Sequence, residues 1–430
     1  MKKQVHAIEV IHVKETEDSH EEPDPLALST NELFKSMHCL VTSLHIFGAI
    51  HINEDPGTKW TASKVHLVAV FLLLVLNQIR MGFNFVNAKI NPEFFWDVMF
   101  YSWMLLAVTN SFNMYKVCIC ERRLVTVFTS WKEFNPRPSK TKTAHFKKKS
   151  RIYITTGWCY LLTSIISSLY AQFATSFLDA NLVPFSIDSS YIDVIRVISV
   201  LLNILISGSW IFVNVLIFFL ADVAHYELRE FNREFRKRLT NDGEFHGELE
   251  EYRQRHQSIC RFINDIDASI HLSVGFSFVV CMVGILLSIY NVIWWQRVRE
   301  DSFMAVMITS WIMNSAITLF CIIIFGAYVN NEAHALANDA YNISLLNTTD
   351  TFRLQVSTFL SRLTGPPIGL TAASMFVIDK PTLLTMFFLK IVGVLVSYFV
   401  LIVQFSPSYS GGQTPSNMSH TAINHSLNVE

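Results

Sequence analysis

Charged residues are scarce in this chain: Asp, Glu, Lys and Arg together make up 16% of its 430 residues. A soluble globular protein usually carries about a quarter. Apolar residues account for 51% and aromatic residues for 13%. This composition argues against a cytosolic enzyme, a nucleic-acid-binding protein and a disordered scaffold. The formal net charge is −1, so the molecule as a whole has no field that would steer a charged partner.

The chain also lacks the motifs of common catalytic and cofactor sites. It contains no G-x-G-x-x-G, no G-x-x-x-x-G-K-[ST], no H-E-x-x-H, no pair of C-x-x-C and no G-x-S-x-G. We therefore predict that it is not an enzyme and has no catalytic residues, cofactor or metal site. None of its seven cysteines falls in a predicted outer loop, so no structural disulfide is expected.

Long apolar runs are abundant. A helix needs about 20 apolar residues to cross the hydrocarbon core of a bilayer. Seven runs reach that length: 66–86, 94–117, 152–178, 194–221, 269–294, 303–329 and 383–405. A further stretch, 33–50, is interrupted by Lys35, His38 and His45, and we interpret it as an amphipathic helix at the membrane interface. The sequence thus predicts an all-α membrane protein with seven transmembrane helices.

Lys and Arg are distributed unevenly between the segments that join these runs. They concentrate in 1–64, 118–151, 223–265 and 330–382, and 406–430 has none. Because basic loops remain in the cytosol, we predict an inverted topology with a cytosolic N-terminus and an extracellular C-terminus. The predicted parts are an acidic N-terminal segment (1–35), an interfacial helix and linker (36–64), a six-helix sensing domain (66–329) with cytosolic loops 118–151 and 223–265, an anchor helix and linker (330–382), a seventh helix (383–405) and an outer tail (406–430).

The fourth apolar run continues as a helix beyond the membrane. Leu228, Phe231 and Phe235 keep a spacing of three to four through a highly charged segment. A turn signal follows at 241–243, and a second apolar stripe then leads into the fifth run. This pattern predicts a cytosolic helical hairpin, which would pack on itself and on copies of itself. In the outer tail, Asn417 and Asn424 are predicted glycosylation sites.

The seventh run carries one narrow polar stripe. Lys390, Val394, Ser397, Leu401 and Gln404 follow at spacings of four and three, which places them on one helix face. In a symmetric oligomer such a face would line a pore, because polar side chains in hydrocarbon need protein or water beside them. The alternative is that Ser397 and Gln404 bond to neighbouring helices while Lys390 extends to the interface.

The end of this run resembles a known family. Ser397 and Tyr398, five apolar residues, then Gln404 and Phe405 are similar to the terminal motif of the invertebrate gustatory receptors, with Ser in place of Thr. The resemblance implies a homotetrameric, stimulus-gated cation channel in the plasma membrane of sensory neurons. Its partners would be lipid, cations, a stimulus, and copies of itself or related subunits, without nucleic acid. Its seventh helix would line the pore, with Gln404 and Phe405 near the outer gate.

The same resemblance implies a stimulus pocket among spans two to six. Its predicted lining residues are Tyr101, Trp103, Tyr170, Gln172, Asn203, Tyr290, Asn291, Trp311 and Asn314. Aromatic faces with a few amide and hydroxyl groups suit sugars and small aromatic molecules alike. Trp103, Trp210 and Trp311 lie deep in their spans, whereas Trp96, Trp294 and Trp295 lie where an interfacial aromatic belt is expected.

More than one kind of stimulus is compatible with the sequence. A nematode branch of the family senses light and hydrogen peroxide, and Trp60 and Trp311 resemble its two tryptophans. We take this branch first and an ordinary tastant receptor, for a sugar or bitter compound, second. A transporter is the alternative outside the class, although no inverted repeat or paired broken helices are visible.

Overall fold

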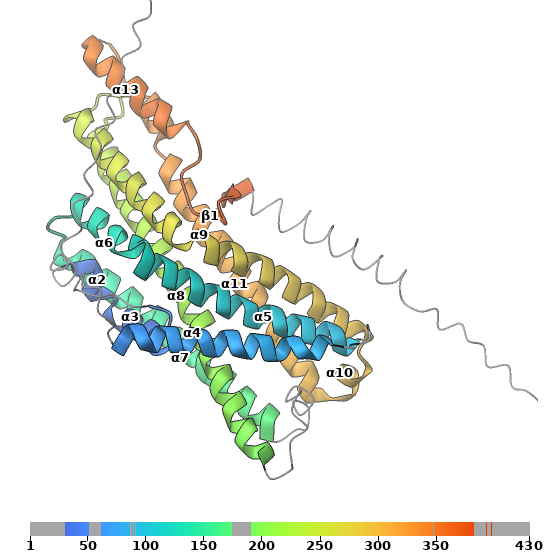
Figure 1. The fold of residues 1–430 in the computed structure, drawn as a ribbon. Helices are drawn as coiled ribbons and strands as arrows, with labels where there is room; N and C mark the ends of the chain where they lie inside the picture. The colour runs from blue at the N-terminus through green and yellow to red at the C-terminus, as the bar shows by residue number, and fades with distance from the viewer. Residues whose placement is uncertain are drawn as a thin grey trace, which may run out of the picture.

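The computed structural model describes residues 31–50, 62–86, 88, 90, 92–173, 191–346, 348–381, 393 and 397. Its long helices form a bundle, in which two of them diverge from the others at one end (Figure 1). They are α4 (Ala62–Gly82), α5 (Pro92–Tyr115), α7 (Lys140–Phe173), α8 (Ile192–Arg238), α9 (Leu249–Trp294) and α11 (Ser302–His334). Predicted spans four to six lie within α8, α9 and α11, and the first two extend a few residues past the ends of α4 and α5. The third lies in α7 up to residue 173, and its last residues, 174–178, are outside the described part of the chain.

Five of these helices, α4, α7, α8, α9 and α11, are long and apolar enough to cross a membrane. Helix α5 has 24 residues, sufficient for a span, but Glu93, Asp97 and several amides and hydroxyls make it more polar. The seventh predicted span, 383–405, lies outside the described residues apart from positions 393 and 397.

Helix α8 occupies the centre of the bundle. In its most apolar stretch 83% of the residues are buried, against 28% for α4 and 17% for α7. The outer helices instead expose aliphatic side chains such as Leu76 and Ile79 on α4 and Leu162 and Ile166 on α7. Apolar surface of this kind is stable in contact with lipid tails, so α4 and α7 face the bilayer.

The N-terminal helices α2 (Glu32–Ser36) and α3 (His38–Ile46) pack against α7 and α8. Their apolar side chains Leu33, Met37, Leu40 and Leu44 are fully buried in the protein core. The predicted interfacial helix thus presents its apolar side to protein. Asn31 begins α2 by accepting from the backbone N–H of Leu33 and Phe34, and its amide donates to the carbonyl of Phe128 at 2.7 Å.

Helices α8 and α9 continue past the predicted spans and form the hairpin. Their connection turns at Gly243, which has a φ of +80°, a conformation that glycine adopts without steric cost. Leu228, Phe231 and Phe235 point into the hairpin and are fully buried. Helix α13 (Asp350–Leu363) packs on α9, with Phe359 in contact with Phe235. Near it lies α12 (Ala337–Tyr341).

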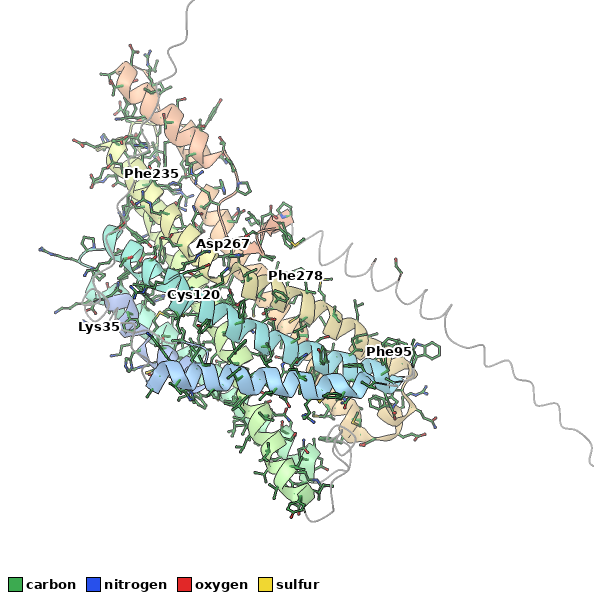
Figure 2. All side chains as sticks on the ribbon, in the orientation of Figure 1. Lys35, Phe95, Cys120, Phe235, Asp267 and Phe278 are labelled. Carbon is green, nitrogen blue, oxygen red and sulfur yellow. The ribbon has the colours of Figure 1, made fainter. Side chains whose placement is uncertain are left out.

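Short elements join the long helices. They are the 3₁₀ turn η1 (Phe83–Phe85), the π-turn η2 (Lys116–Cys120), α6 (Arg123–Phe134) and α10 (Gln296–Glu300). Strands β1 (Thr371–Ala372) and β2 (Phe376–Val377) form a small antiparallel hairpin on α9. Figure 2 shows Asp267 close to this hairpin, with Phe278 farther along the same bundle. The hairpin ends only a few residues before the predicted pore helix 383–405.

Candidate functional site

A partly open cavity of about 170 Å³ lies within the membrane bundle. Five helices contribute to it: α5, α7, α8, α9 and α11. Its lining residues are Trp96, Met99, Phe100, Trp103, Tyr160, Thr163, Ser164, Ser167, Ser168, Ala171, Asn203, Ser207, Trp210, Ile211, Val280, Cys281, Met307, Ser310, Trp311, Asn314 and Ser315. These helices carry predicted spans two to six, among which the family resemblance implies a stimulus pocket.

One wall of the cavity is aromatic. The indole ring of Trp311 lies 5.2 Å from that of Trp103 and 6.2 Å from that of Trp96, measured between ring centroids. Phe100 completes the cluster at 6.1 Å from Trp311. Trp295 extends it behind Trp96, at 5.9 Å. Tilted and edge-to-face arrangements at these distances are favourable and hold the rings in place.

Another part of the lining is made of small polar groups. Helix α7 contributes Thr163, Ser164, Ser167 and Ser168, and Ser164 is bonded to Ser207 of α8 at 3.0 Å. The indole N–H of Trp210 is buried and has no hydrogen-bond partner among the residues that the structure describes. An unpaired buried donor costs free energy, so a ligand with an acceptor oxygen would gain by reaching it.

The described lining contains no Asp, Glu, Lys or Arg. A charged ligand would therefore lose its hydration without gaining a counter-ion. The cavity is small: its volume of about 170 Å³ is close to the roughly 150 Å³ that accommodates a benzene ring. The arrangement suits a small uncharged organic molecule, with a ring or apolar body on the indoles and a hydroxyl or carbonyl toward the serines and amides.

Four of the nine residues predicted for the pocket lie together here: Trp103, Asn203, Trp311 and Asn314. The other five lie elsewhere. Tyr101 packs edge-on to Phe85, Tyr170 contacts Phe303, Gln172 donates to Ser199, Tyr290 contacts Phe95, and Asn291 is fully buried. These five residues lie on helix faces that do not line the cavity. The position of a residue along its span does not show which face of the helix it occupies.

The sequence reasoning also missed several lining residues. Trp96 is not among the nine predicted residues, because an interfacial belt was the alternative for it, but that side chain is 4% exposed and lies against Trp311. The hydroxyl-bearing face of α7 is also absent from the predicted pocket. Its signal was present in the sequence, because Ser164, Ser168 and Ala171 recur at spacings of four and three in an apolar helix. Small residues at that spacing leave space between packed helices.

The remaining predicted site residues lie outside the described part of the chain. They are Trp60, Lys390, Val394, Tyr398, Leu401, Gln404, Phe405, Asn417 and Asn424. Ser397 is described as helical and exposed. The pore face and the glycosylation sites therefore stay predictions.

The cavity is linked to the β-hairpin through the α5–α9 interface. Ser288 donates to the sulfur of Met99 at 3.0 Å, and Asn113 donates to Ser273 at 2.9 Å. Residue numbers thus rise along α9 as they fall along α5, so the two helices are antiparallel. Asp267 lies about two turns before Ser273 on α9, and its carboxylate is hydrogen-bonded to β1. Helix α9 therefore runs without a break from the cavity wall to the hairpin.

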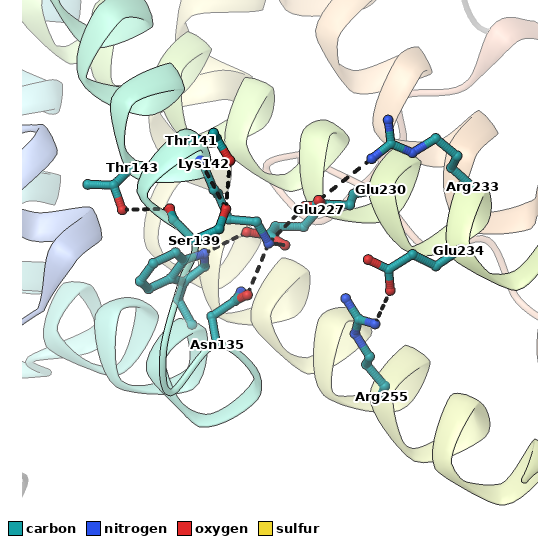
Figure 3. Close-up of polar contacts among 11 residues, drawn as sticks. Asn135, Ser139, Thr141, Lys142, Thr143, Glu227, Glu230, Arg233, Glu234 and Arg255 are labelled. Atoms are coloured by element: carbon teal, nitrogen blue, oxygen red, sulfur yellow. Dashed lines mark hydrogen bonds and ion pairs between the residues drawn. The ribbon is translucent and has the colours of Figure 1, made fainter.

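A buried ionic cluster fixes the membrane-distal part of the bundle (Figure 3). Lys142 of α7 lies 2.9 Å from the carboxylates of both Glu227 and Glu230 on α8 and donates to Asn135 at 3.0 Å. Trp131 of α6 donates its indole N–H to Glu227 at 3.0 Å. Burial alone would lower the pKa of Lys142, but the two carboxylates outweigh that effect and raise it. Lys142 is therefore charged in the folded protein.

Comparison with known proteins agrees with this fold. The model of the family described as "7tm Chemosensory receptor" matches residues 37–409. The solved structure of the insect olfactory receptor OR5 from Machilis hrabei superposes with a TM-score of 0.64 at 15% identity, covering 89% of this chain and 99% of that chain. The structure of the same receptor in complex with eugenol superposes equally well, with a TM-score of 0.64 at 14% identity and the same coverage.

No curated protein sequence matches the chain. The family model nevertheless spans most of its length, and the structural similarity covers 89% of the chain. Both findings agree with a multi-pass membrane protein. The chain belongs to the seven-transmembrane chemosensory receptor family.

Proposed function

We propose that this protein is a gustatory-type receptor in the plasma membrane of sensory neurons, which opens a cation-conducting pore when a small uncharged molecule occupies the cavity. The observation that carries the proposal is the cavity itself, with an indole wall, a hydroxyl and amide wall and no charged group in its described lining. The terminal motif Ser397–Phe405 supports the gustatory branch.

The proposed pore is formed by four copies of the seventh helix. The stripe of Lys390, Val394, Ser397, Leu401 and Gln404 would face the axis, with Phe405 beside the outer gate. One helix with a single polar stripe covers only one side of an ion pathway. In a symmetric tetramer, four copies of the stripe would surround that pathway. The cytosolic hairpins of α8 and α9, with α13, would pack the four subunits together.

The route from cavity to pore follows α9 and the β-hairpin. Trp103, Val280 and Cys281 bring α5 and α9 to the cavity wall. The carboxylate of Asp267 on α9 accepts from the backbone N–H of Thr371 at 2.6 Å, and Ala373 N–H donates to the carbonyl of His271 at 2.9 Å. A shift of α9 on ligand binding would therefore move the hairpin and the segment that follows it.

The test is to express the full chain alone in cells and record currents while small uncharged compounds, including sugars and flat aromatic molecules, are applied. Trp311→Ala should raise the half-maximal concentration of an effective compound at least about tenfold, because an aromatic wall and its buried area are lost. Trp294→Ala is the matched control, since that exposed tryptophan lies outside the cavity. Equal behaviour of the two variants would place the stimulus elsewhere.

A second candidate stimulus, light or hydrogen peroxide, is favoured by the tryptophan cluster itself. Trp96, Trp103, Trp295 and Trp311 are linked by centroid distances of 5.2–6.2 Å, close enough for their excited states to interact. Trp311→Phe keeps an aromatic wall but removes the absorbing and oxidisable indole. A light or peroxide response should be abolished by Phe as fully as by Ala, whereas a tastant response should be partly retained with Phe.

A further inference from the structure

A second hollow, of about 770 Å³, lies outside the membrane bundle between α7, α8 and α11. It is open to solvent and separate from the stimulus cavity. We name it the basic groove. Its lining residues are His145, Lys149, Asp222, His225, Tyr226, Arg229, Glu230, Arg233, Arg236, Lys237 and Glu332. Five are lysine or arginine and three are carboxylates, so the groove carries net positive charge.

The cations follow one face of α8. Arg229, Arg233 and Arg236 recur at spacings of four and three, and Lys237 lies beside them. All four are exposed, whereas the opposite face of the helix carries the buried Leu228, Phe231 and Phe235. Like charges one turn apart destabilise a helix. A stripe of them is therefore stabilised by an anion that contacts several cations at once.

The carboxylates of the groove are already engaged. Asp222 pairs with Lys149 at 3.3 Å, Glu230 with the buried Lys142 at 2.9 Å, and Glu332 with the amide of Asn232 at 2.9 Å. Within the described part of the chain, neither Arg229 nor Lys237 forms an ion pair. Arg233 reaches Glu230 only at 3.8 Å and is 67% exposed. These three side chains therefore keep hydrogen-bond donors for an external ligand.

The groove begins where the helices leave the membrane. Lys149 and Asp222 flank the ends of predicted spans 152–178 and 194–221, and Glu332 follows the end of 303–329. Arg229 lies seven residues beyond Asp222, about 10 Å along the helix axis, which is within reach of a lipid headgroup. Lys147, Lys148 and Arg151 add exposed positive charge at the same level. The topology derived from the sequence assigns this side to the cytosol, where the leaflet is anionic.

We propose that the basic groove binds the phosphorylated headgroup of an anionic membrane phospholipid, with Arg229, Arg233 and Lys237 holding its phosphates. Arginine side chains bind phosphate oxygens bidentately and lysine adds a point charge. A lipid is favoured over a soluble polyphosphate because the groove opens at the membrane boundary, where the acyl chains can remain in the bilayer. Bound lipid would bridge α7, α8 and α11 and stabilise their arrangement.

The test uses the full-length protein purified in detergent. Binding of dioctanoyl phosphatidylinositol 4,5-bisphosphate is measured by native mass spectrometry and by the rise in unfolding temperature, beside dioctanoyl phosphatidylcholine and inositol 1,4,5-trisphosphate. The test variant is Arg229→Gln/Arg233→Gln/Lys237→Gln. The matched control is Lys140→Gln/Arg261→Gln/Arg353→Gln, which removes the same charge from exposed positions outside the groove.

We expect the anionic lipid to bind the wild type and the control equally, and to bind the test variant at least about tenfold more weakly. Phosphatidylcholine should bind far more weakly to all three proteins. Equal loss in the control and test variants would show a general charge effect and overturn the site. Inositol trisphosphate binding as tightly as the lipid would assign the groove to a soluble polyphosphate and overturn the lipid assignment. Unchanged binding in the test variant would overturn the proposal outright.

Discussion

The carboxylate of Asp267 on α9 accepts hydrogen bonds from both the backbone N–H and the hydroxyl of Thr371, the first residue of β1. The backbone N–H lies 2.6 Å from one oxygen, and the hydroxyl lies 3.0 Å and 2.9 Å from the two oxygens. This side chain thereby fastens the β-hairpin to the helix that forms part of the cavity wall. Gly275 permits the close approach, because a Cβ there would lie 2.5 Å from the Cβ of Ala373.

We predict that Asp267→Ala weakens the coupling between stimulus and current without preventing assembly. The carboxylate is largely desolvated, and removing it leaves the Thr371 donors without their acceptor, at a cost of about 1–3 kcal/mol. Maximal current should fall, and backbone hydrogen exchange at 369–378 should accelerate. Asp267→Asn, which keeps one acceptor, should give an intermediate effect. Unchanged exchange in the Ala variant would show that the hairpin is held by other contacts.

Stability should depend on pH through His256, which lies on α9 outside the predicted span. Burial lowers the pKa of this imidazole to about 4, and Arg362 and His334 add to the effect, while a hydrogen bond to the carbonyl of Ala333 opposes it. Because the unfolded state binds a proton from about pH 6.5 downwards and the folded state only near pH 4, stability is lost as the pH falls between these values. The loss is on the order of 3 kcal/mol.

The measurement is the unfolding temperature of purified protein from pH 7.5 to 4. His256→Gln removes the titrating group and should flatten this part of the profile, even if the variant is less stable at pH 7.5. Other charged and titratable groups near the imidazole are Cys260 on its own helix, His334 at the end of α11 and Arg362 on α13. A pH profile identical to that of the wild type would assign the dependence to one of these.

Breaking the buried cluster at Lys142 should be strongly destabilising. Lys142→Met leaves Glu227 and Glu230 without their main counter-charge, and Glu227 is only 1% exposed. Removing one partner of a buried ion pair typically costs about 3–5 kcal/mol. The unfolding temperature and the yield of assembled protein should both fall. Arg261→Gln is the control, since its pairing with Glu133 is exposed and 3.8 Å long, so it should have little effect.

Gly208→Ala should destabilise the protein although alanine favours helices. A Cβ at position 208 would lie 2.2 Å from the ring of Phe47, whose carbonyl accepts a hydrogen bond from Ser209 at 3.1 Å. Overpacking of this kind costs about 1–3 kcal/mol, which exceeds the gain of up to about 1 kcal/mol in helix propensity. Gly284→Ala, where the Cβ would lie 3.5 Å from the hydroxyl of Ser315, should be neutral or stabilising.

The pore proposal predicts which positions of the seventh helix meet water. Cysteines introduced at Leu401 and Gln404 should react with membrane-impermeant thiol reagents and block the current. A cysteine at Val400, on a different face of the helix, should react much less. A conducting channel that is insensitive at all three positions would remove this helix from the pore. An external tag after Glu430 that stains on intact cells would separately test the predicted orientation.

The helices themselves follow from the sequence. Runs of about 20 apolar residues must be helical in a bilayer, because every backbone N–H and C=O needs an internal partner. In the described part of the chain, most of each of the first six predicted spans accordingly lies in α4, α5, α7, α8, α9 or α11. The hairpin beyond the membrane was predictable for the same kind of reason, since Leu228, Phe231 and Phe235 keep the helical period through charged surroundings.

The tertiary structure alone decided which face of each helix meets which neighbour. In a bilayer an apolar face can meet lipid or protein, so hydropathy does not distinguish the exposed Leu76 of α4 from the buried Ile217 of α8. Trp96 and Tyr101 lie on one helix five residues apart, yet only Trp96 reaches the cavity. The sequence determined the membrane architecture through the cost of unpaired backbone, whereas the cavity in the bundle and the basic groove depend on helix rotation and packing, which only the assembled bundle sets.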